Sequence, residues 1–174
     1  EVLGRRAGVG KEAFHAILKS HEKEYLLGHC TTKDFWKKVC QNTDISYDKF
    51  VREISAYEIN DNVLELLRSL RKRYELVLIT DNYDALFHAM AHDRKLRGLF
   101  DYSFYSHQLH MVKMYDEEKI FRHVLKTIKA NAEDCVFIDD KKINLAHARK
   151  LGIHTILFKD IRQLRKELAS YSVR

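Results

Sequence analysis

The sequence predicts an α/β fold, a Rossmann-like parallel sheet flanked by helices, together with a small helical cap. Residues 11–57 show helical periodicity only, whereas helices and short apolar runs alternate from about residue 60 onward. The stretch CVFIDDKKINLAHARKLGIHTILF, at 135–158, has the order strand, acidic pair, helix, glycine, strand, which is typical of a βαβ unit. We therefore expect a helical cap at 11–57 and an α/β core formed by 1–10 and 58–174.

The first part of the chain is expected to contain three helices. KEAFHAILKSHEKEYL forms the first, Thr32 can cap the second in TKDFWKKVC, and Ser46 can cap the third in YDKFVREIS. The aromatic residues of the second and third helices form the cap's own core or, alternatively, line a pocket for a ligand. These residues are Phe35, Trp36, Tyr47 and Phe50.

The remainder of the chain alternates between amphipathic helices and short apolar strands. The expected helices begin at Asp61, span 84–96 with Gly98 as the C-terminal stop, follow Asp116 as N-cap, and span 161–169. The expected strands are 76–79, 102–105, 135–138 and 155–158. This order of elements predicts a parallel sheet with helices on its faces.

Composition and charge exclude several classes of protein. The 174 residues are 45% hydrophobic and 32% charged, as in an ordinary globular protein. No apolar run approaches the ~18 residues of a membrane span, and the N-terminus lacks the apolar core of a signal peptide. We therefore expect no membrane association and a cytoplasmic location. The net charge of +6 favours anionic substrates such as phosphate esters, while no motif for nucleic acid is present.

The cysteines and histidines show no motif for a structural metal site. Cys30, Cys40 and Cys135 form no CxxC, which indicates a reducing compartment. The ten histidines are scattered. His88 and His92 have the i, i+4 spacing that two ligands on one helix face would need, but no HExxH-type carboxylate accompanies them.

Polar side chains gather where three of the expected strands end. They are Thr80-Asp81-Asn82 after the strand at 76–79, Lys113 after the strand at 102–105, and Asp139-Asp140 after the strand at 135–138. Because the carboxyl ends of parallel strands meet at one edge, we expect these clusters to converge. Adjacent carboxylates are costly unless a cation lies beside them, and Mg²⁺ is the oxygen-seeking ion that suits such a pair. Taken singly, each cluster also has an ordinary explanation as a cap, turn or surface residue.

The order of these clusters closely resembles the haloacid dehalogenase superfamily, whose members are mostly phosphatases. ITDN at 79–82 is similar to its second motif, and SHQLHMVKMYDEEKIF at 106–121 to its third, often S-x-x-x-G-x-x-K-P-x-P. FIDDKKINLAHA at 137–148 is similar to the fourth motif, the most specific of the three. The helical region 11–57 stands where this family carries a small helical cap, so the resemblance covers nearly the whole chain.

The resemblance implies roles for the second and third motifs. Thr80 would bind the phosphoryl oxygens, assisted by the backbone at Asp81 and Asn82. Lys113 would neutralise charge on the nucleophile and the phosphoryl group, and would pair with an acid of the fourth motif. The ligand implied is a small phosphorylated substrate.

In the fourth motif, the resemblance implies a magnesium site. Asp140 would be the direct Mg²⁺ ligand, Asp139 would assist, and Asn144 would be a supporting residue. The third motif departs from the family pattern in two places, since His110 replaces the usual Gly and Met114 the usual Pro. Histidine tolerates a left-handed backbone better than most residues, so we expect the loop at His110 to keep that conformation.

The first motif of the family, D-x-D-x-[TV], is absent from the sequence. It supplies the nucleophilic aspartate and the general acid. Glu1-Val2-Leu3 could be its tail, so we expect both aspartates to lie upstream of Glu1. The strand that carries them would be central, between the strands at 76–79 and 135–138. Three explanations remain open for the first motif. Its residues were left out of the sequence, another chain supplies them, or the strands at 76–79 and 135–138 pair directly.

The main hypothesis is a Mg²⁺-dependent phosphatase of a small phosphorylated metabolite that works through an aspartyl-phosphate. The 174 residues alone are then expected to show no turnover. One alternative is a non-catalytic binding or regulatory module or an inactive fragment, and another is a phosphomutase on the same scaffold. The acidic pair at 139–140 implies a metal and so disfavours a dehalogenase.

Overall fold

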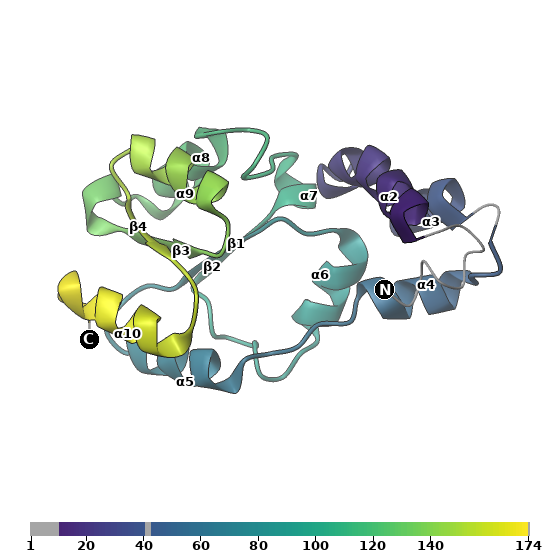
Figure 1. The fold of residues 1–174 in the computed structure, drawn as a ribbon. Helices are drawn as coiled ribbons and strands as arrows, with labels where there is room; N and C mark the ends of the chain where they lie inside the picture. Colours follow the sequence, from purple (N-terminus) through teal and green to yellow (C-terminus); the bar gives the residue numbers. More distant parts are fainter. Residues whose placement is uncertain (1–10, 41–42, 174) are drawn as a thin grey trace. The chain divides into compact units, whose positions relative to one another are not determined.

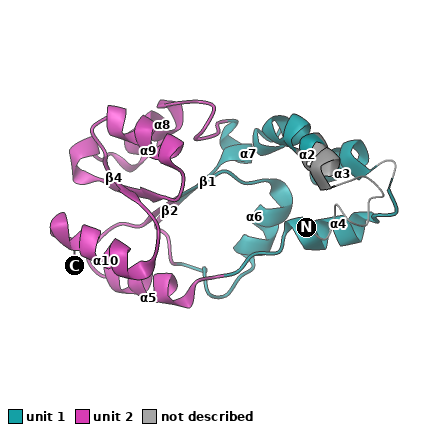
Figure 2. Cartoon of the chain, in the orientation of Figure 1, with its two compact units in different colours: residues 1–58, 79–98, 103–110 teal, residues 59–78, 99–102, 111–174 magenta. Residues whose placement is uncertain are grey.

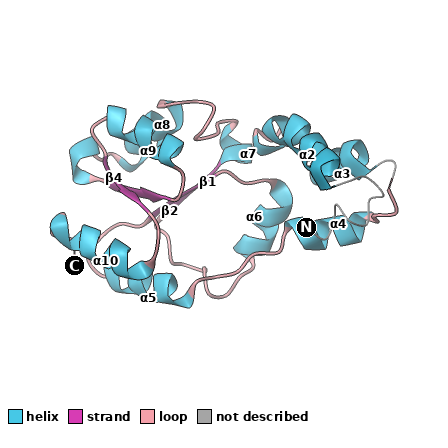
Figure 3. Cartoon of the chain, in the orientation of Figure 1, coloured by secondary structure: helices cyan, strands magenta, loops and turns pink. Residues whose placement is uncertain are grey.

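Helices and short strands alternate along the chain in the computed structural model, which describes residues 11–40 and 43–173. Figure 1 shows their order, and Figure 3 colours them by type. The first helices are α2 (Lys11–Leu26), α3 (Thr32–Cys40), α4 (Tyr47–Ile54), α5 (Asp61–Leu70), α6 (Asp84–Ala91) and α7 (Ser106–Leu109). The others are α8 (Lys119–Ile128), η1 (Ala132–Asp134), α9 (Lys142–Lys150) and α10 (Ile161–Ser170). The strands are β1 (Val77–Thr80), β2 (Tyr102–Tyr105), β3 (Val136–Asp139) and β4 (His154–Leu157).

The predicted α/β class is confirmed by the βαβ unit that β3, α9 and β4 form. β3 and β4 are parallel, with Val136 opposite His154 and Asp139 opposite Leu157. Among the described residues the strands form two separate sheets, in which β1 pairs with β2 and β3 with β4. The alternative in which the strands at 76–79 and 135–138 pair directly is therefore not what the structure shows for these residues.

The chain divides into two compact units, coloured separately in Figure 2. Unit 1 contains the chain up to residue 58 together with 79–98 and 103–110, and unit 2 contains 59–78, 99–102 and 111–174. The predicted division into a cap at 11–57 and a core in the rest of the chain stays a prediction. Its assignment of residues 1–10 to the core lies outside the described residues.

An aromatic core holds unit 1 together. Tyr25 stacks on Phe35, with ring centroids 4.2 Å apart, and on Tyr83, at 4.6 Å. Phe35 and Phe50 belong to a buried cluster with Val39 and Ile45, so these two aromatic residues are part of the core of unit 1. Trp36 Nε1 donates to the Ile45 carbonyl at 2.9 Å and the ring meets Tyr47 edge-on.

Unit 2 has its own apolar core, in which helices α5 and α10 pack against β4. The buried residues of this cluster are Leu66, Leu70, Ile156, Leu164 and Leu168. A second contact joins α8 to β3, where the Phe121 and Phe137 rings meet edge-on at 4.9 Å. Burial of such side chains fixes β3, and with it the polar residues that follow β3. No described helix has both the length and the apolar character that crossing a membrane requires.

Two of the expected helix starts were assigned to the wrong residue. Thr31, rather than Thr32, caps α3, because its hydroxyl accepts from the Asp34 N–H at 3.2 Å. The Thr32 hydroxyl donates to Asp84 instead. Asp116 does not cap α8, which begins at Lys119, since its carboxylate accepts from the Val112 N–H at 2.8 Å. In contrast, Ser46 caps α4 as predicted.

Helix α6 ends at Ala91, five residues before the expected end. Asp93 explains the early stop, since its carboxylate accepts from the Lys95 N–H at 2.7 Å and the Tyr57 hydroxyl at 2.8 Å. Such side-chain bonds to nearby backbone compete with helix formation. Gly98 has the positive φ of +68° expected of a chain reversal, but it lies beyond the helix.

Gly28, between α2 and α3, is a point of close backbone approach within unit 1. Its φ is +71°, and a Cβ built on it would lie 2.1 Å from the carbonyl oxygen of His107. Only glycine fits both requirements. The absence of a side chain at this position therefore lets the α2–α3 turn lie against α7.

Candidate functional site

Asp139 lies at the carboxyl end of β3 and is the centre of a buried polar cluster in unit 2. The Lys113 ammonium donates to Asp139 Oδ2 at 2.9 Å, and the two side chains are 10% and 6% exposed. Asn144 Nδ2 lies 3.1 Å from both carboxylate oxygens, and the Lys141 N–H donates to Oδ1 at 2.8 Å. The predicted pairing of Lys113 with an acid of the fourth motif is thus present, and the acid is Asp139.

The electrostatics of this cluster favour the ionised form of Asp139. Burial raises the pKa of the Asp139 carboxyl, but the Lys113 ammonium, the Lys141 N–H and the Asn144 amide outweigh it. The pKa of Asp139 therefore lies below its ordinary value. The ion pair holds the Lys113 ammonium in place although it is almost fully removed from water.

This lowered pKa predicts an acid-dependent loss of stability. The stabilisation from ionised Asp139 is fully present above the ordinary Asp pKa of about 3.9 and is lost as the pH falls through the lower folded-state value. We expect the difference in free energy of unfolding between the wild type and Asp139→Asn to shrink below about pH 4. Urea unfolding at a series of pH values measures it. A difference that stays constant down to about pH 2 would contradict the assignment.

Asp140, the next residue, differs from Asp139 in its surroundings. Its side chain is exposed, and no hydrogen bond or ion pair to it is seen among the described residues. Mg²⁺ is commonly held by one or two carboxylates and several waters. The exposed Asp140 oxygens fit that pattern, whereas the Asp139 oxygens already accept several bonds. Within residues 11–40 and 43–173, no three His, Cys, Asp or Glu side chains form a complete metal cluster.

Asn144 holds Asp139 from the first turns of α9. Its side chain is 1% exposed, its Nδ2 group faces the carboxylate, and its Oδ1 has no hydrogen-bond partner among the described residues. Buried amide oxygens are normally paired. Asn144 therefore has the supporting position expected from the sequence and retains one unused acceptor.

The residues of the second motif lie in unit 1. Thr80 ends β1 and is partly buried, as is Asp81. Asn82 is fully buried, and its N–H donates to Ser106 Oγ at 2.8 Å. The Ser106 hydroxyl donates back to the Asn82 carbonyl at 2.9 Å. The backbone N–H of Asn82, expected to assist phosphate binding, is thus already bonded to the first residue of the third motif.

The sequence did not identify Ser106 as a residue that joins two motifs. The available signal was its position as the first letter of S-x-x-x-G-x-x-K. The structure brings Lys113, Asp139 and Asn144 together in unit 2, next to Asp140. It joins the end of the second motif to Ser106 in unit 1. The convergence of these two groups on one site stays a prediction.

His110 has the left-handed conformation expected where the family usually has glycine. Its φ and ψ are 54° and 35°. Its Nδ1 lies 2.7 Å from the carbonyl oxygen of Leu27, at the end of the first cap helix. Because a carbonyl oxygen only accepts hydrogen bonds, Nδ1 carries the proton. This hydrogen bond offsets part of the cost of placing a residue with a Cβ in that region.

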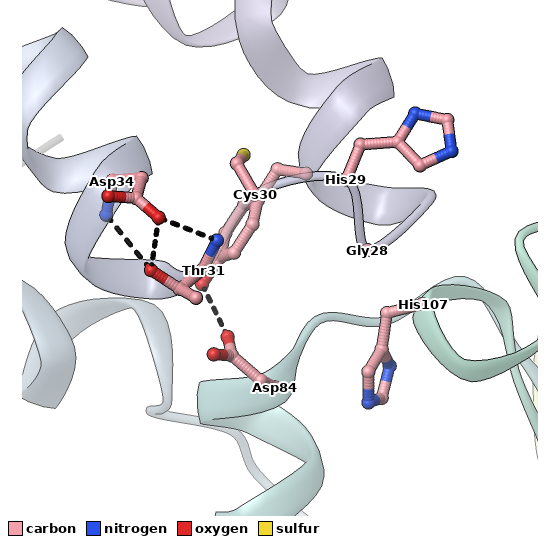
Figure 4. Close-up of a pocket in the computed structure, with 8 residues that line it drawn as sticks. Gly28, His29, Cys30, Thr31, Asp34, Asp84 and His107 are labelled. Atoms are coloured by element: carbon pink, nitrogen blue, oxygen red, sulfur yellow. Dashed lines mark hydrogen bonds between the residues drawn. The ribbon is translucent and has the colours of Figure 1, made fainter.

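A pocket of about 230 Å³ lies in unit 1, and the sequence did not predict it. Figure 4 shows its lining side chains, from the α2–α3 turn, the start of α6 and α7. They are Tyr25, Gly28, His29, Cys30, Thr31, Asp34, Asp84 and His107. Asp84 accepts from the Tyr25 hydroxyl at 3.2 Å and from the Thr32 N–H at 3.2 Å. Burial lowers the pKa of His107, which favours its neutral form.

Comparison with known proteins identifies the family. The model of the haloacid dehalogenase-like hydrolases matches residues 10–158. The rat (Rattus norvegicus) bifunctional epoxide hydrolase 2 is 32% identical over 136 residues, which are 74% of this chain and 24% of that protein. The mouse (Mus musculus) protein of the same name is 31% identical over 127 residues, 68% of this chain and 22% of that protein. The chain therefore spans about a quarter of the length of these curated relatives.

Solved structures show the same fold. A predicted haloacid dehalogenase-like hydrolase from Porphyromonas gingivalis has a TM-score of 0.73 at 21% identity, over 89% of this chain and 86% of that chain. An enzyme of the family from Bacteroides thetaiotaomicron, in complex with magnesium and inorganic phosphate, has a TM-score of 0.71 at 22% identity, over 88% of each chain. These similarities agree with the motifs at 79–82, 106–121 and 137–148. The chain belongs to the haloacid dehalogenase-like hydrolases.

Proposed function

We propose that this chain provides the phosphate-binding and magnesium-binding part of a Mg²⁺-dependent phosphatase that acts on a small phosphorylated metabolite. One observation carries the proposal. The buried Lys113–Asp139 ion pair lies at the carboxyl end of a parallel strand and is followed directly by the exposed Asp140. A fixed ammonium beside a free carboxylate suits the binding of a phosphoryl group together with a divalent cation.

Each residue of this site has a distinct role in the proposal. Lys113, which Asp139 holds in place, neutralises negative charge on the phosphoryl group. Asp140 holds the magnesium ion. Mg²⁺ supplies positive charge that stabilises the developing negative charge on the phosphoryl oxygens. Asn144 keeps the Asp139 carboxylate in its orientation.

Two further observations support this proposal. The structurally similar enzyme from Bacteroides thetaiotaomicron was crystallised with magnesium and inorganic phosphate. The net charge of +6 favours the approach of phosphate esters. Epoxide hydrolysis, named for the mammalian relatives, belongs to proteins of which this chain matches about a quarter.

A binding or regulatory module without catalytic activity is the second candidate. It is favoured by the absence of any D-x-D pair in the 174 residues, because an aspartyl-phosphate requires a nucleophilic aspartate. In the phosphatase proposal that aspartate belongs to a segment upstream of Glu1. The phosphatase proposal therefore predicts that adding a D-x-D strand before Glu1 produces activity, whereas the binding-module candidate predicts that it does not.

A phosphoester assay distinguishes them. We expect no turnover by the 174 residues, and Mg²⁺-dependent release of phosphate when an apolar strand ending in D-x-D-x-T precedes Glu1. In that extended protein, Asp140→Asn should remove the Mg²⁺ dependence together with most of the activity, and a loss of about 10²-fold or more is expected. Glu133→Gln, an exposed acid before β3, is the matched control. An extended, folded protein that is inert on a broad phosphoester panel would leave the binding module as the function.

A further inference from the structure

His29 and His110 form an exposed pair of imidazoles in unit 1. Their ring centroids are 5.7 Å apart and their planes are inclined by 28°. His29 lies in the turn between α2 and α3, and His110 follows α7. Both side chains are exposed, so an ion from solvent can reach them. Neither residue has a role in the proposed phosphatase site.

The hydrogen bonds of the two rings leave the same nitrogen available on each. His110 Nδ1 donates to the Leu27 carbonyl at 2.7 Å, and His29 Nδ1 lies 2.9 Å from Glu24 Oε2. With the proton on Nδ1, each Nε2 carries a lone pair, and neither Nε2 has a partner among the described residues. Histidines that bind metals characteristically donate their other N–H to a carboxylate or a backbone carbonyl. The partner of His29 is the Glu24 carboxylate, and the partner of His110 is the Leu27 carbonyl.

The spacing of the rings suits one shared ion. Two imidazoles bound to Zn²⁺ at ~2.1 Å with a tetrahedral angle have ring centroids about 5 Å apart. The observed separation of 5.7 Å is close to this value, and both side chains are exposed. We propose that His29 and His110 form a binding site for one divalent transition-metal ion of the Zn²⁺ type, with water completing its coordination. Imidazole nitrogens favour such ions over Mg²⁺, which prefers oxygen ligands.

Asp34, His88 and His92 do not share these properties. Figure 4 shows the His29 ring extending away from Thr31 and Asp34. His88, in α6, and His92, which follows that helix, have suitable spacing, but none of their ring nitrogens is seen bonded to a carboxylate or carbonyl in the described part of the chain. They therefore lack the preorganisation that Glu24 and Leu27 give to the proposed pair.

A bound ion would join two segments that are distant in sequence. It would link the turn after α2 to the residue that follows α7, beside the existing hydrogen bond from His110 to Leu27. Gly28 already lies against the His107 carbonyl at the same place. The ion would thus strengthen an existing contact within unit 1.

Calorimetric titration of the 174-residue protein with Zn²⁺ alone tests the proposal. We expect one ion per chain at about pH 7.5. His29→Ala and His110→Asn should each weaken binding at least tenfold; asparagine tolerates the left-handed backbone at 110. Glu24→Gln should weaken it by about tenfold, because Glu24 only orients a ligand. His88→Ala is the matched control and should leave the affinity unchanged.

The histidine ring resonances in NMR spectra provide a second readout. Zn²⁺ should shift the Nε2 signals of His29 and His110, and Mg²⁺ should not, which separates this site from the proposed magnesium site. Circular dichroism establishes that each variant is folded. Unchanged Zn²⁺ affinity in the folded His29→Ala and His110→Asn variants would overturn the proposal, as would loss of binding in His88→Ala alone. Neither outcome depends on phosphatase activity.

Discussion

Replacing Lys113 with methionine is expected to lower the free energy of unfolding by about 3–5 kcal/mol. The substitution keeps most of the side-chain volume but removes the ammonium that pairs with Asp139 at 2.9 Å. Both partners are about nine-tenths buried, so the carboxylate would remain in a poorly solvated site without its cation. The lowered pKa of Asp139, which depends on Lys113, should then rise.

Urea denaturation of the wild type and Lys113→Met measures this loss. Lys150→Met is the matched control, because Lys150 pairs with Glu118 at 3.2 Å while its side chain is 58% exposed. Surface pairs of this kind contribute about 0–1 kcal/mol. The double variant Lys113→Met, Asp139→Asn should recover part of the lost stability, since no unpaired charge remains. A loss below about 1 kcal/mol for Lys113→Met would show that the pair is better solvated than its burial implies.

Replacing Gly28 with alanine is expected to destabilise unit 1 by about 2–5 kcal/mol. Two costs add at this position. The left-handed conformation, with φ of +71°, costs a residue with a Cβ about 1–2 kcal/mol. The new methyl group would also lie 2.1 Å from the His107 carbonyl oxygen, and relieving that overlap requires the backbone to move.

Gly98→Ala separates these two costs. Gly98 has nearly the same φ, +68°, but a Cβ there would meet nothing within 4 Å. We expect a loss of about 1–2 kcal/mol at Gly98 and a larger loss at Gly28. Thermal unfolding and amide hydrogen exchange of the α2–α3 turn measure the global and local effects. Equal losses at the two positions would mean that the α2–α3 turn does not lie against His107 in solution.

Local sequence patterns predicted the elements and part of the site. The apolar runs placed β1, β3 and β4 within a residue of their observed ends, because buried strands need continuous apolar side chains. The resemblance to the haloacid dehalogenase superfamily implied an acidic partner for Lys113 in the fourth motif, and the structure shows that this acid is Asp139. The left-handed backbone at His110 was also predictable, since few residue types adopt it.

Features that depend on distant segments could not be predicted. Asp84 attracts the Thr32 hydroxyl away from capping α3, across 52 positions of sequence. Asp93, which ends α6 early, accepts a hydrogen bond from the hydroxyl of Tyr57, a residue of another segment. The pocket draws its lining from three separate segments of the chain. Each of these features depends on a contact between segments that are far apart in the sequence. Local sequence patterns do not predict such contacts, because they form only in the tertiary structure.

The Ser106 hydroxyl forms hydrogen bonds with two main-chain groups of Asn82, its N–H and its carbonyl. The same oxygen accepts from the N–H and donates to the C=O of a fully buried residue. An alanine at 106 would leave the Asn82 N–H without its acceptor and would remove one donor from the Asn82 carbonyl, whereas a threonine could keep both hydrogen bonds. Only a hydroxyl-bearing residue at position 106 can therefore keep both bonds and, with them, the shape of the turn after β1.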